Sequence, residues 1–386
     1  MSSQPFLAKP GLRVPANDFG RQWQDLGRAL TAAFQDVGES GWYVLGREVA
    51  AFEEELARLW GVPHAVGVGS GLDAIEISLR LLGCQPGDKV LTTPLSAFAT
   101  TLAILKLGAV PVFADCDTHG LISLDACEEL LDRAPDIRYF VPVHLYGHSL
   151  DLDRLAYLRD RFQLRVVEDC AQSIGARWNG LAAHRTTGAV GQATATSFYP
   201  TKNLGAFGDG GAILTSDPEF AQRARQFRDY GQSSKYRHDF IGCNSRLDEL
   251  QAALLSRVLL PELNGWIEKR CRIARTYLAG LAHPGIVPLG KPEHSESSWH
   301  LFPVAIAPDR KAAFLGHLKE NWITPGEHYP IAIPDQPALA SAPHENRDGC
   351  PTARRLCASE VSLPIHPYLT EEEVQHVIDI CNRWRG

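Results

Sequence analysis

The chain has 386 residues, of which 45% are hydrophobic and 22% are charged, and these ordinary proportions exclude a mainly disordered protein. Its 38 basic and 45 acidic side chains give a net charge of −7 at pH 7, which disfavours a generic binder of nucleic acid or of an anionic membrane surface. At about 150 residues per domain, the length predicts two domains, or one large domain with a smaller partner.

The chain carries no signal of export or of a metal site. The uncharged runs contain proline and polar residues and are shorter than the ~20 mainly apolar residues that a membrane span needs. The N-terminus lacks a basic segment followed by an apolar core. The nine cysteines include no CxxC pair, so we expect reduced thiols in a cytoplasmic protein, without bound metal.

The first sixty residues predict two helices, over 18–37 and 47–60, with a glycine-rich turn region between them. After them, short apolar runs alternate with helical stretches. The predicted strands are 65–68, 89–92, 110–114, 139–143, 165–168, 193–198 and 211–215, and the predicted helices among them are 72–82, 97–106, 124–134 and 152–162. This alternation indicates βα units and a mainly parallel sheet flanked by helices, which binds ligands at the carboxyl ends of its strands.

The rest of the chain begins with helices and changes its pattern from about residue 284. Helices are predicted over 218–230, 247–260 and 262–281, followed by short strands and proline-rich turns, with the clearest strand over 299–306. A last helix over 370–385 opens with Thr370 and Glu373 in the spacing of a capping box. We therefore expect a large domain of residues 1–250 and a small C-terminal α+β domain of residues 251–386.

A lysine follows the strand predicted over 193–198. Lys202 stands in the segment TSFYPTKNLG among uncharged residues and close to several glycines. A lysine in a desolvated pocket loses its proton more easily and can form a Schiff base with a carbonyl group. Taken alone, Lys202 also fits a surface lysine in a loop.

An aspartate follows the strand predicted over 165–168. Asp169 lies in the segment VVEDCAQS, where a carboxylate points toward the ligand crevice of a parallel sheet. A carboxylate in this place can keep a pyridine nitrogen protonated and so make the ring an electron sink. A helix cap or a buried structural carboxylate is the alternative.

A glycine-rich turn joins the strand predicted over 65–68 to the next helix. Its segment VGVGSGLDA places backbone N–H groups at a helix N-terminus, which suits an anion, although a tight structural turn is equally compatible. The turn lacks the lysine of a P-loop and the GxGxxG spacing of a dinucleotide fold, which argues against both.

Together, the turn, the aspartate and the lysine resemble the active-site pattern of fold-type I enzymes that use pyridoxal phosphate (PLP). The segments GSGLDAI, VVEDCAQSIGA, SFYPTKNLGAFGDGGA, GCNSRLDELQAA and SLPIHPYLTEEEV resemble the DegT/DnrJ/EryC1/StrS family of sugar aminotransferases, over residues 20 to 380. The resemblance implies an α/β fold-type I transferase with a smaller C-terminal α+β domain and with PLP as cofactor.

The resemblance also implies roles for individual residues. Lys202 would form the Schiff base with PLP, and Asp169 would pair with the pyridine nitrogen. The other implied cofactor contacts are Ser70, Gly71 and Ser197 at the phosphate, Gln172 at the phenolic oxygen and Phe98 against the ring. An ordinary core position is the alternative for Phe98.

Further implied contacts involve a second subunit and the substrate. Asn244 would reach the cofactor phosphate of a partner, which implies a homodimer with shared active sites; a helix cap is the alternative. The candidates for substrate binding are Arg246, His328 and Tyr329, although Pro334 replaces a second family histidine nearby. His144, Tyr146 and His148 surround Gly147 at a strand end, where pocket-lining and structural roles are both compatible.

The implied reaction moves an amino group from L-glutamate to a nucleotide-linked keto sugar, with Lys202 carrying protons. The motifs are most similar to the branch that acts at C3 of dTDP-3-keto-6-deoxyhexoses; C4 amination or a UDP- or GDP-linked sugar is the alternative. A PLP-dependent sugar dehydratase would have histidine in place of Lys202. A non-catalytic PLP-fold protein would be expected to lose the lysine, the aspartate or the turn, and this chain keeps all three.

Overall fold

The computed structural model describes residues 12–181 and 185–386. Its centre is a seven-stranded sheet in the order β1-β9-β8-β5-β4-β2-β3. Neighbouring strands run parallel from β8 to β3, and only β9 is antiparallel to both of its neighbours. The strands are β1 (His64–Val68), β2 (Lys89–Thr92), β3 (Val110–Phe113), β4 (Tyr139–Val141), β5 (Arg165–Asp169), β8 (Ala193–Ser197) and β9 (Gly211–Thr215). The predicted α/β class with a mainly parallel sheet is confirmed.

Helices cover both faces of this sheet, and the strand residues alternate between them. Ile213 packs with the helices of one face, whereas Ala212 and Leu214 pack with those of the other. The first face carries α3 (Gly71–Leu81), α4 (Phe98–Lys106) and α7 (Pro218–Phe227). The second face carries α1 (Phe19–Ser40), α2 (Arg47–Trp60), α5 (Leu124–Arg133), α6 (Leu152–Arg161) and α8 (Glu249–Leu254).

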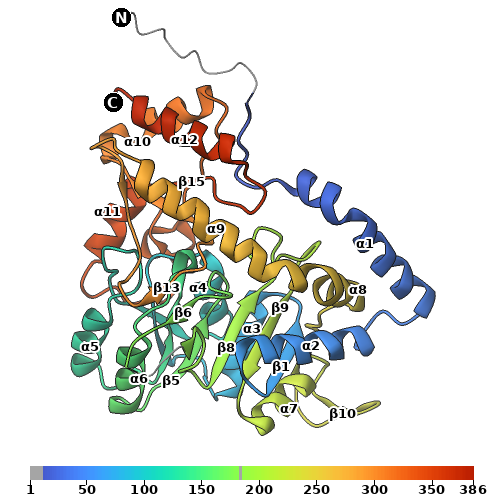
Figure 1. Cartoon of the computed structure of the whole chain (residues 1–386). Helices are drawn as coiled ribbons and strands as arrows, with labels where there is room; N and C mark the ends of the chain where they lie inside the picture. The colour runs from blue at the N-terminus through green and yellow to red at the C-terminus, as the bar shows by residue number, and fades with distance from the viewer. Residues whose placement is uncertain (1–11, 182–184) are drawn as a thin grey trace, which may run out of the picture.

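A long helix, α9 (Leu260–Gly280), leads from the sheet to a smaller unit at one end of the molecule (Figure 1). This unit packs helices against a three-stranded antiparallel sheet in the order β12-β14-β15. Its elements are β12 (Val287–Pro288), β14 (Phe302–Ala305), α10 (Pro308–Glu320), β15 (Glu360–Leu363) and α12 (Glu371–Arg383). The predicted capping box is present, because Thr370 and Glu373 exchange hydrogen bonds at the start of α12.

Not every C-terminal element packs into this smaller unit. Helix α11 (Pro351–Ser359) and the segment around Ile333 pack into the hydrophobic core beside β3 and β4 of the large sheet. The division into residues 1–250 and 251–386 therefore stays a prediction. The remaining strands are the short β6 (Arg177–Trp178), β7 (Arg185–Thr186), β10 (Gln232–Ser234), β11 (Arg237–His238) and β13 (Ser295–Glu296).

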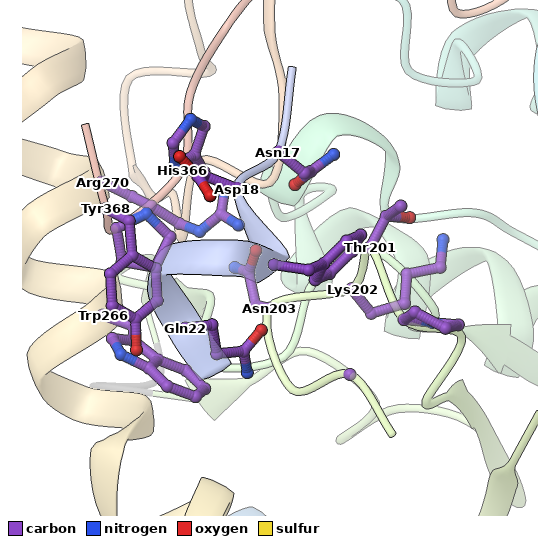
Figure 2. A pocket seen from close by; sticks show the side chains of 14 residues that line it. Asn17, Asp18, Gln22, Thr201, Lys202, Asn203, Trp266, Arg270, His366 and Tyr368 are labelled. Atoms are coloured by element: carbon purple, nitrogen blue, oxygen red, sulfur yellow. The ribbon is translucent and has the colours of Figure 1, made fainter. Parts of the chain in front are cut away.

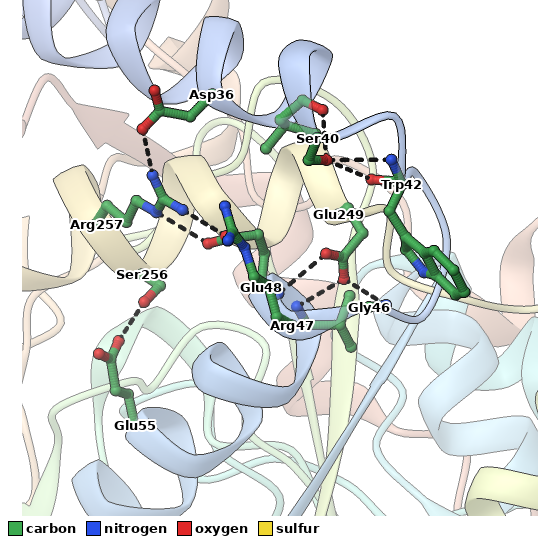
Figure 3. A network of polar contacts seen from close by, with 12 residues as sticks. Asp36, Ser40, Trp42, Gly46, Arg47, Glu48, Glu55, Glu249, Ser256 and Arg257 are labelled. Carbon is green, nitrogen blue, oxygen red and sulfur yellow. Dashed lines mark hydrogen bonds and ion pairs between the residues drawn. The ribbon is translucent and has the colours of Figure 1, made fainter.

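A buried carboxylate joins α8 to the start of α2 (Figure 3). Glu249 accepts hydrogen bonds from the backbone N–H groups of Gly46, Glu48 and Val49 at 2.7, 3.0 and 2.9 Å. Helix α2 has no side-chain cap of its own. Glu249 therefore satisfies the N–H groups that a helix N-terminus leaves free, and its charge suits the positive end of the helix dipole.

Within the described residues, no helix combines the length and the apolar character that crossing a membrane requires.

Candidate active site

A cavity of about 380 Å³ opens where β5 and β8 end, as predicted for a parallel sheet. Its wall combines the start of α3, the start of α4, the residues after β5 and β8, and two segments from the C-terminal third of the chain. Predicted site residues in this wall are Ser70, Gly71, Asp169, Gln172, Ser197, Lys202, His328 and Tyr329. Residues that the sequence did not single out include Thr100, Tyr199, Asp209 and His300.

Lys202 lies in a turn after β8, where its backbone N–H donates to the carbonyl of Tyr199 at 2.8 Å. Burial lowers the pKa of the Lys202 ammonium from 10.5 to about 8, and the attraction of Asp169 only partly opposes this. A lysine with this pKa is neutral in about a tenth of the molecules at pH 7, far more than at a pKa of 10.5, so it can act as a nucleophile and a proton carrier.

Asp169 is held at both carboxylate oxygens at the end of β5. Oδ1 accepts from the backbone N–H of Ala171 at 3.0 Å, and Oδ2 accepts from the hydroxyl of Thr100 at 2.8 Å. Burial raises the pKa of Asp169, while these two hydrogen bonds and the charge of Lys202 act in the opposite direction. The carboxylate is thereby fixed in place facing the cavity.

A buried pair, Glu168 and His144, supports this strand end from behind. His144 Nε2 lies 2.9 Å from the Glu168 carboxylate, which also accepts three backbone N–H groups, those of Gly188, Val190 and Gly191. Burial works against the charged form, but the imidazole and the amides outweigh it and lower the pKa of Glu168. His144 is therefore structural and does not line the cavity.

The phosphate end of the cavity is shaped by a close contact between α3 and β8. A Cβ atom on Gly71 would lie 2.7 Å from Cβ of Ser197, so no larger residue fits there without displacement. The Ser70 hydroxyl accepts from the backbone N–H of Asp73 at 3.1 Å and so caps α3. This leaves a cradle at a helix N-terminus beside a serine hydroxyl, which fits a phosphate group.

Gln172 lines the cavity and connects two segments that are far apart in the chain, those of Tyr146 and Tyr329. Its Oε1 accepts from the backbone N–H of Tyr146 at 2.8 Å, and its Nε2 donates to the hydroxyl of Tyr329 at 2.9 Å. These contacts fix the orientation of the amide. Tyr146 itself is fully buried and does not line the cavity, and the same is true of His148.

Two histidines, His300 and His328, also line the cavity. Burial, with Lys202 nearby, lowers the pKa of His328 to about 4 and that of His300 well below 6.5, so both rings are neutral at pH 7. His300 was missed because its segment reads as the start of a strand. Strand β14 begins only at Phe302, because Trp299 has a left-handed φ of 46° and turns the chain toward the site.

Three predicted site residues lie outside this cavity. Asn244 is exposed and donates to the hydroxyl of Tyr230 at 2.8 Å, while Arg246 pairs with Asp229 at 2.8 Å. Phe98 begins α4 and packs half-buried against the core beside β3, and its neighbours Ala97 and Ala99 line the cavity instead. The stacking role of Phe98 and the roles of Asn244 and Arg246 stay predictions.

A much smaller pocket of about 30 Å³ lies on the other side of the Lys202 loop (Figure 2). Arg270, Trp266 and Tyr368 stand on one side of it, and the Lys202 amine points away from them. Arg270 is buried and donates to the backbone carbonyls of Trp299, His300 and Ile365, so it holds the His300 segment in place. Burial lowers the pKa of Arg270 to about 10.

The residues present fit PLP. The group offers an aldehyde to a lysine, a pyridine nitrogen to a carboxylate and a phosphate to an anion cradle, and the cavity holds Lys202, Asp169 and the Ser70–Gly71 turn together. Within the described ranges, no cluster of three histidine, cysteine or acidic side chains could hold a metal ion. Fold and site therefore define the class of PLP-dependent transferases.

The chain belongs to the DegT/DnrJ/EryC1/StrS aminotransferase family, whose model matches residues 24–382. It is 42% identical to dTDP-3-amino-3,4,6-trideoxy-alpha-D-glucose transaminase of Streptomyces venezuelae over 96% of both chains. It is 34% identical to UDP-N-acetyl-3-dehydro-alpha-D-glucosamine 3-aminotransferase of Acidithiobacillus ferrooxidans, over 96% of this chain and 97% of that one.

Among solved structures, S. venezuelae DesV in complex with a ketimine intermediate matches with a TM-score of 0.91 at 40% identity, over 96% of this chain and 98% of that chain. Family membership confirms the expected enzyme class, an aminotransferase. The expected cofactor, PLP, is confirmed by relatives such as ntda from Bacillus subtilis, which was solved with bound cofactor PMP and matches with a TM-score of 0.83 at 29% identity.

Proposed function

We propose that this aminotransferase moves an amino group from L-glutamate to C3 of a dTDP-linked 3-keto-6-deoxyhexose. The observation that carries the reaction type is the convergence of Lys202, Asp169 and the Ser70–Gly71 turn on one cavity. The choice of C3 and of a nucleotide-linked sugar is supported by the two transaminase relatives, both of which are named for 3-amino or 3-dehydro sugars.

PLP supplies a carbonyl that receives the amino group and a ring that spreads negative charge. Lys202 holds and moves a proton at Nζ, because its lowered pKa permits both the neutral and the charged form near neutral pH. Asp169 would hold the pyridine nitrogen of bound PLP in its protonated form, since its carboxylate is fixed in place by Thr100 and Ala171. The hydrogen bond from Gln172 to Tyr329 positions a phenol next to the same space.

The substrate side of the cavity suits a sugar. His300 and His328 are neutral and Tyr329 is un-ionised, because burial raises its pKa well above 10. Neutral donors and acceptors pair with hydroxyl and carbonyl groups without the cost of burying an unpaired charge. A charged group such as the nucleotide diphosphate is then expected outside this cavity.

The active site is proposed to be shared between two subunits. Asn244 lies outside its own cavity and donates to the exposed Tyr230, while the exposed Tyr199 lines the cavity. Further exposed aromatic side chains are Trp42, Tyr43 and Phe207. Such a surface is typical of a subunit interface, and an isologous dimer would bring each Asn244 to the partner's phosphate cradle.

The experiment uses the purified PLP form, first aminated by L-glutamate and then offered one keto sugar at a time. We expect turnover with a dTDP-3-keto-6-deoxyhexose and a product aminated at C3 by NMR. Faster turnover of the 4-keto isomer or of a UDP-linked 3-keto sugar would replace the proposed substrate by that one. No amination of any keto sugar would overturn the proposal.

A further inference from the structure

A chain of hydrogen bonds runs from a buried carboxylate to the His328 ring. Glu360 and Ser362 lie on β15, and both are almost fully buried. The Ser362 hydroxyl contacts Glu360 Oε1 and also lies 2.9 Å from His328 Nδ1. Glu360 Oε2 accepts from the backbone N–H of His328 at 2.6 Å, so the carboxylate holds both the main chain and, through Ser362, the ring.

The His328 ring has little freedom to turn. Gly326 pairs with Ser362 through two backbone hydrogen bonds of 2.9 Å. A Cβ atom on Gly326 would lie 2.6 Å from His328 Cε1, so the ring rests directly on this glycine. Tyr146 donates from its hydroxyl to the His328 carbonyl at 2.5 Å. With Nδ1 committed to Ser362, the other ring nitrogen is the one available to the cavity that His328 lines.

The direction of the chain depends on the proton of Glu360. When Glu360 is ionised, Oε1 can only accept, so the Ser362 hydroxyl donates to it and His328 Nδ1–H donates to Ser362. His328 is then the Nδ1–H tautomer, and Nε2 presents a lone pair to the cavity.

When Glu360 carries a proton on Oε1, the chain reverses. The carboxylic acid donates to Ser362, and the Ser362 hydroxyl donates to His328 Nδ1, which must now be unprotonated. The ring loses its Nδ1 proton and gains one at Nε2 by exchange with water, and the net change is one proton taken up at Glu360. Oε2 continues to accept from the His328 backbone, so only protons move and every heavy atom can stay in place.

The charges around Glu360 permit both states. Burial raises the pKa of Glu360 to about 7, whereas that of His328 is lowered to about 4, so the ring stays neutral while the carboxylate titrates. The cation Lys311 favours the ionised form of Glu360 but is itself paired with Glu327 at 2.8 Å. The titratable groups that face Glu360 are His328, Lys311, Glu327, Tyr146, Tyr329 and Cys357.

We infer that Glu360, Ser362 and His328 form a proton relay in which Glu360 decides whether His328 Nε2 accepts or donates a hydrogen bond in the cavity. Glu360 is thus a positioning residue, and His328 is the contact it controls. The inference rests on the proposed function for its ligand, a hydroxyl or keto oxygen of the sugar. A hydroxyl proton is recognised by the ionised state of the relay, and a keto oxygen by the protonated state.

The test reads the tautomer without any substrate. The PLP-loaded protein is labelled with ¹⁵N-histidine, and the ¹⁵N shifts of His328, assigned by their loss in His328→Gln, are followed from about pH 5.5 to 8.5. We expect the Nε2–H form at low pH and the Nδ1–H form at high pH, with a midpoint near the Glu360 pKa of about 7. One unchanged tautomer across this range would overturn the relay.

Variants separate the relay from a general structural effect. Glu360→Gln cannot ionise, and its amide can donate to Ser362, so His328 should stay Nε2–H at every pH. Ser362→Ala should abolish the pH-dependent exchange. Ser359→Ala is the matched control, because Ser359 is a buried neighbour whose hydroxyl donates to the carbonyl of Leu356 and takes no part in the chain of hydrogen bonds from Glu360 to His328. A Glu360→Gln protein that switches like the wild type would contradict the inference.

A kinetic arm tests the link to the sugar. The KM for the keto sugar should depend on pH around 7 in the wild type but not in Glu360→Gln, while the reaction with L-glutamate keeps its pH profile. Should the NMR exchange occur while no keto sugar is turned over, the relay stands and the proposed substrate is wrong. Should the KM profiles of the two proteins coincide, the role of the relay in sugar binding is refuted.

Discussion

At the scale of single residues, the lowered pKa of Lys202 has a measurable consequence. Only the neutral amine attacks the PLP carbonyl, so the rate at which apoprotein takes up PLP should rise with pH and level off above about 8. In Asp169→Asn the attracting carboxylate is absent, and the midpoint should move to lower pH. Absorbance of the cofactor follows the reaction, and a midpoint near the unperturbed 10.5 would contradict the burial of this amine.

Thr100 is a second residue for which the structure predicts the direction of a substitution's effect, here on the pKa of Asp169. Its hydroxyl donates to Asp169 Oδ2, so Thr100→Val should raise the pKa of Asp169 and favour transfer of the pyridine proton to the carboxylate, which leaves the ring a poorer electron sink. A hydrogen bond to a charged group contributes ~1.5–3 kcal/mol, which corresponds to a loss of about tenfold to a hundredfold in the rate of the reaction with L-glutamate.

Thr101→Val is the control for this substitution. Thr101 is the adjacent residue, equally buried, and its hydroxyl has no hydrogen-bond partner among the residues that the structure describes. We expect Thr101→Val to keep the wild-type rate. Equal losses in the two variants would assign the effect to packing of α4 instead of to Asp169.

The residues that could be predicted are those in contiguous motifs. Lys202, Asp169 and the Ser70–Gly71 turn follow strands of a parallel sheet, and the topology of such a sheet brings strand ends together. Thr100 and His300 could not be found in this way. Their roles depend on contacts between segments far apart in the chain, and neither lies in a motif with its own chemistry.

At the scale of helices and strands, the loss of the Glu249 side chain should clearly lower the free energy of unfolding. Glu249→Ala removes the acceptor of three backbone N–H groups at the start of α2. A buried charge-assisted contact of this kind stabilises a protein by ~1.5–3 kcal/mol, and we expect a loss of that size in urea unfolding.

The matched control for Glu249 lies on α2 itself. Glu54 is exposed on the helix whose start Glu249 caps, so Glu54→Ala should change the unfolding free energy by less than about 0.5 kcal/mol. A Glu249→Ala protein with an unchanged free energy of unfolding would mean that water satisfies these amides equally well.

The periodicity of hydrophobic residues predicted where most helices and strands lie, but not where a helix changes its geometry. Strands β2 and β9 coincide with their predictions. The helix predicted over 247–260 instead divides into α8 and a π-helical turn (Leu255–Leu259) that runs directly into α9, where Pro261 occupies the first turn. Proline fits a helix start, but the sequence pattern does not reveal that the preceding turn widens to continue the same axis.

At the scale of the whole molecule, the proposed sharing of active sites predicts complementation. Lys202→Ala and Asn244→Ala should each be inactive or nearly so. A heterodimer of the two keeps one intact site, in which Lys202 comes from one chain and Asn244 from the other. An equal mixture with random exchange should therefore recover about one quarter of the wild-type activity.

The control mixture combines Lys202→Ala with Asp169→Asn. Lys202 and Asp169 line the same cavity of one chain, so each site of this heterodimer lacks one of the two residues and the mixture should stay inactive. Failure of the first mixture, with heterodimers demonstrated, would place Asn244 in its own subunit's site or outside any site. Full activity of Asn244→Ala alone would show that Asn244 has no role at the cofactor site of either subunit.

Lys202 and PLP are proposed to exchange an amino group with a donor in the cavity at the ends of β5 and β8. The most direct test is the visible absorbance of the purified PLP form before and after addition of L-glutamate, for the wild type and for Lys202→Ala. We expect a band that L-glutamate converts to the aminated form of the cofactor in the wild type, and no such catalysed conversion in the variant. A band that L-glutamate leaves unchanged in the wild type, or equal conversion in both proteins, would contradict it.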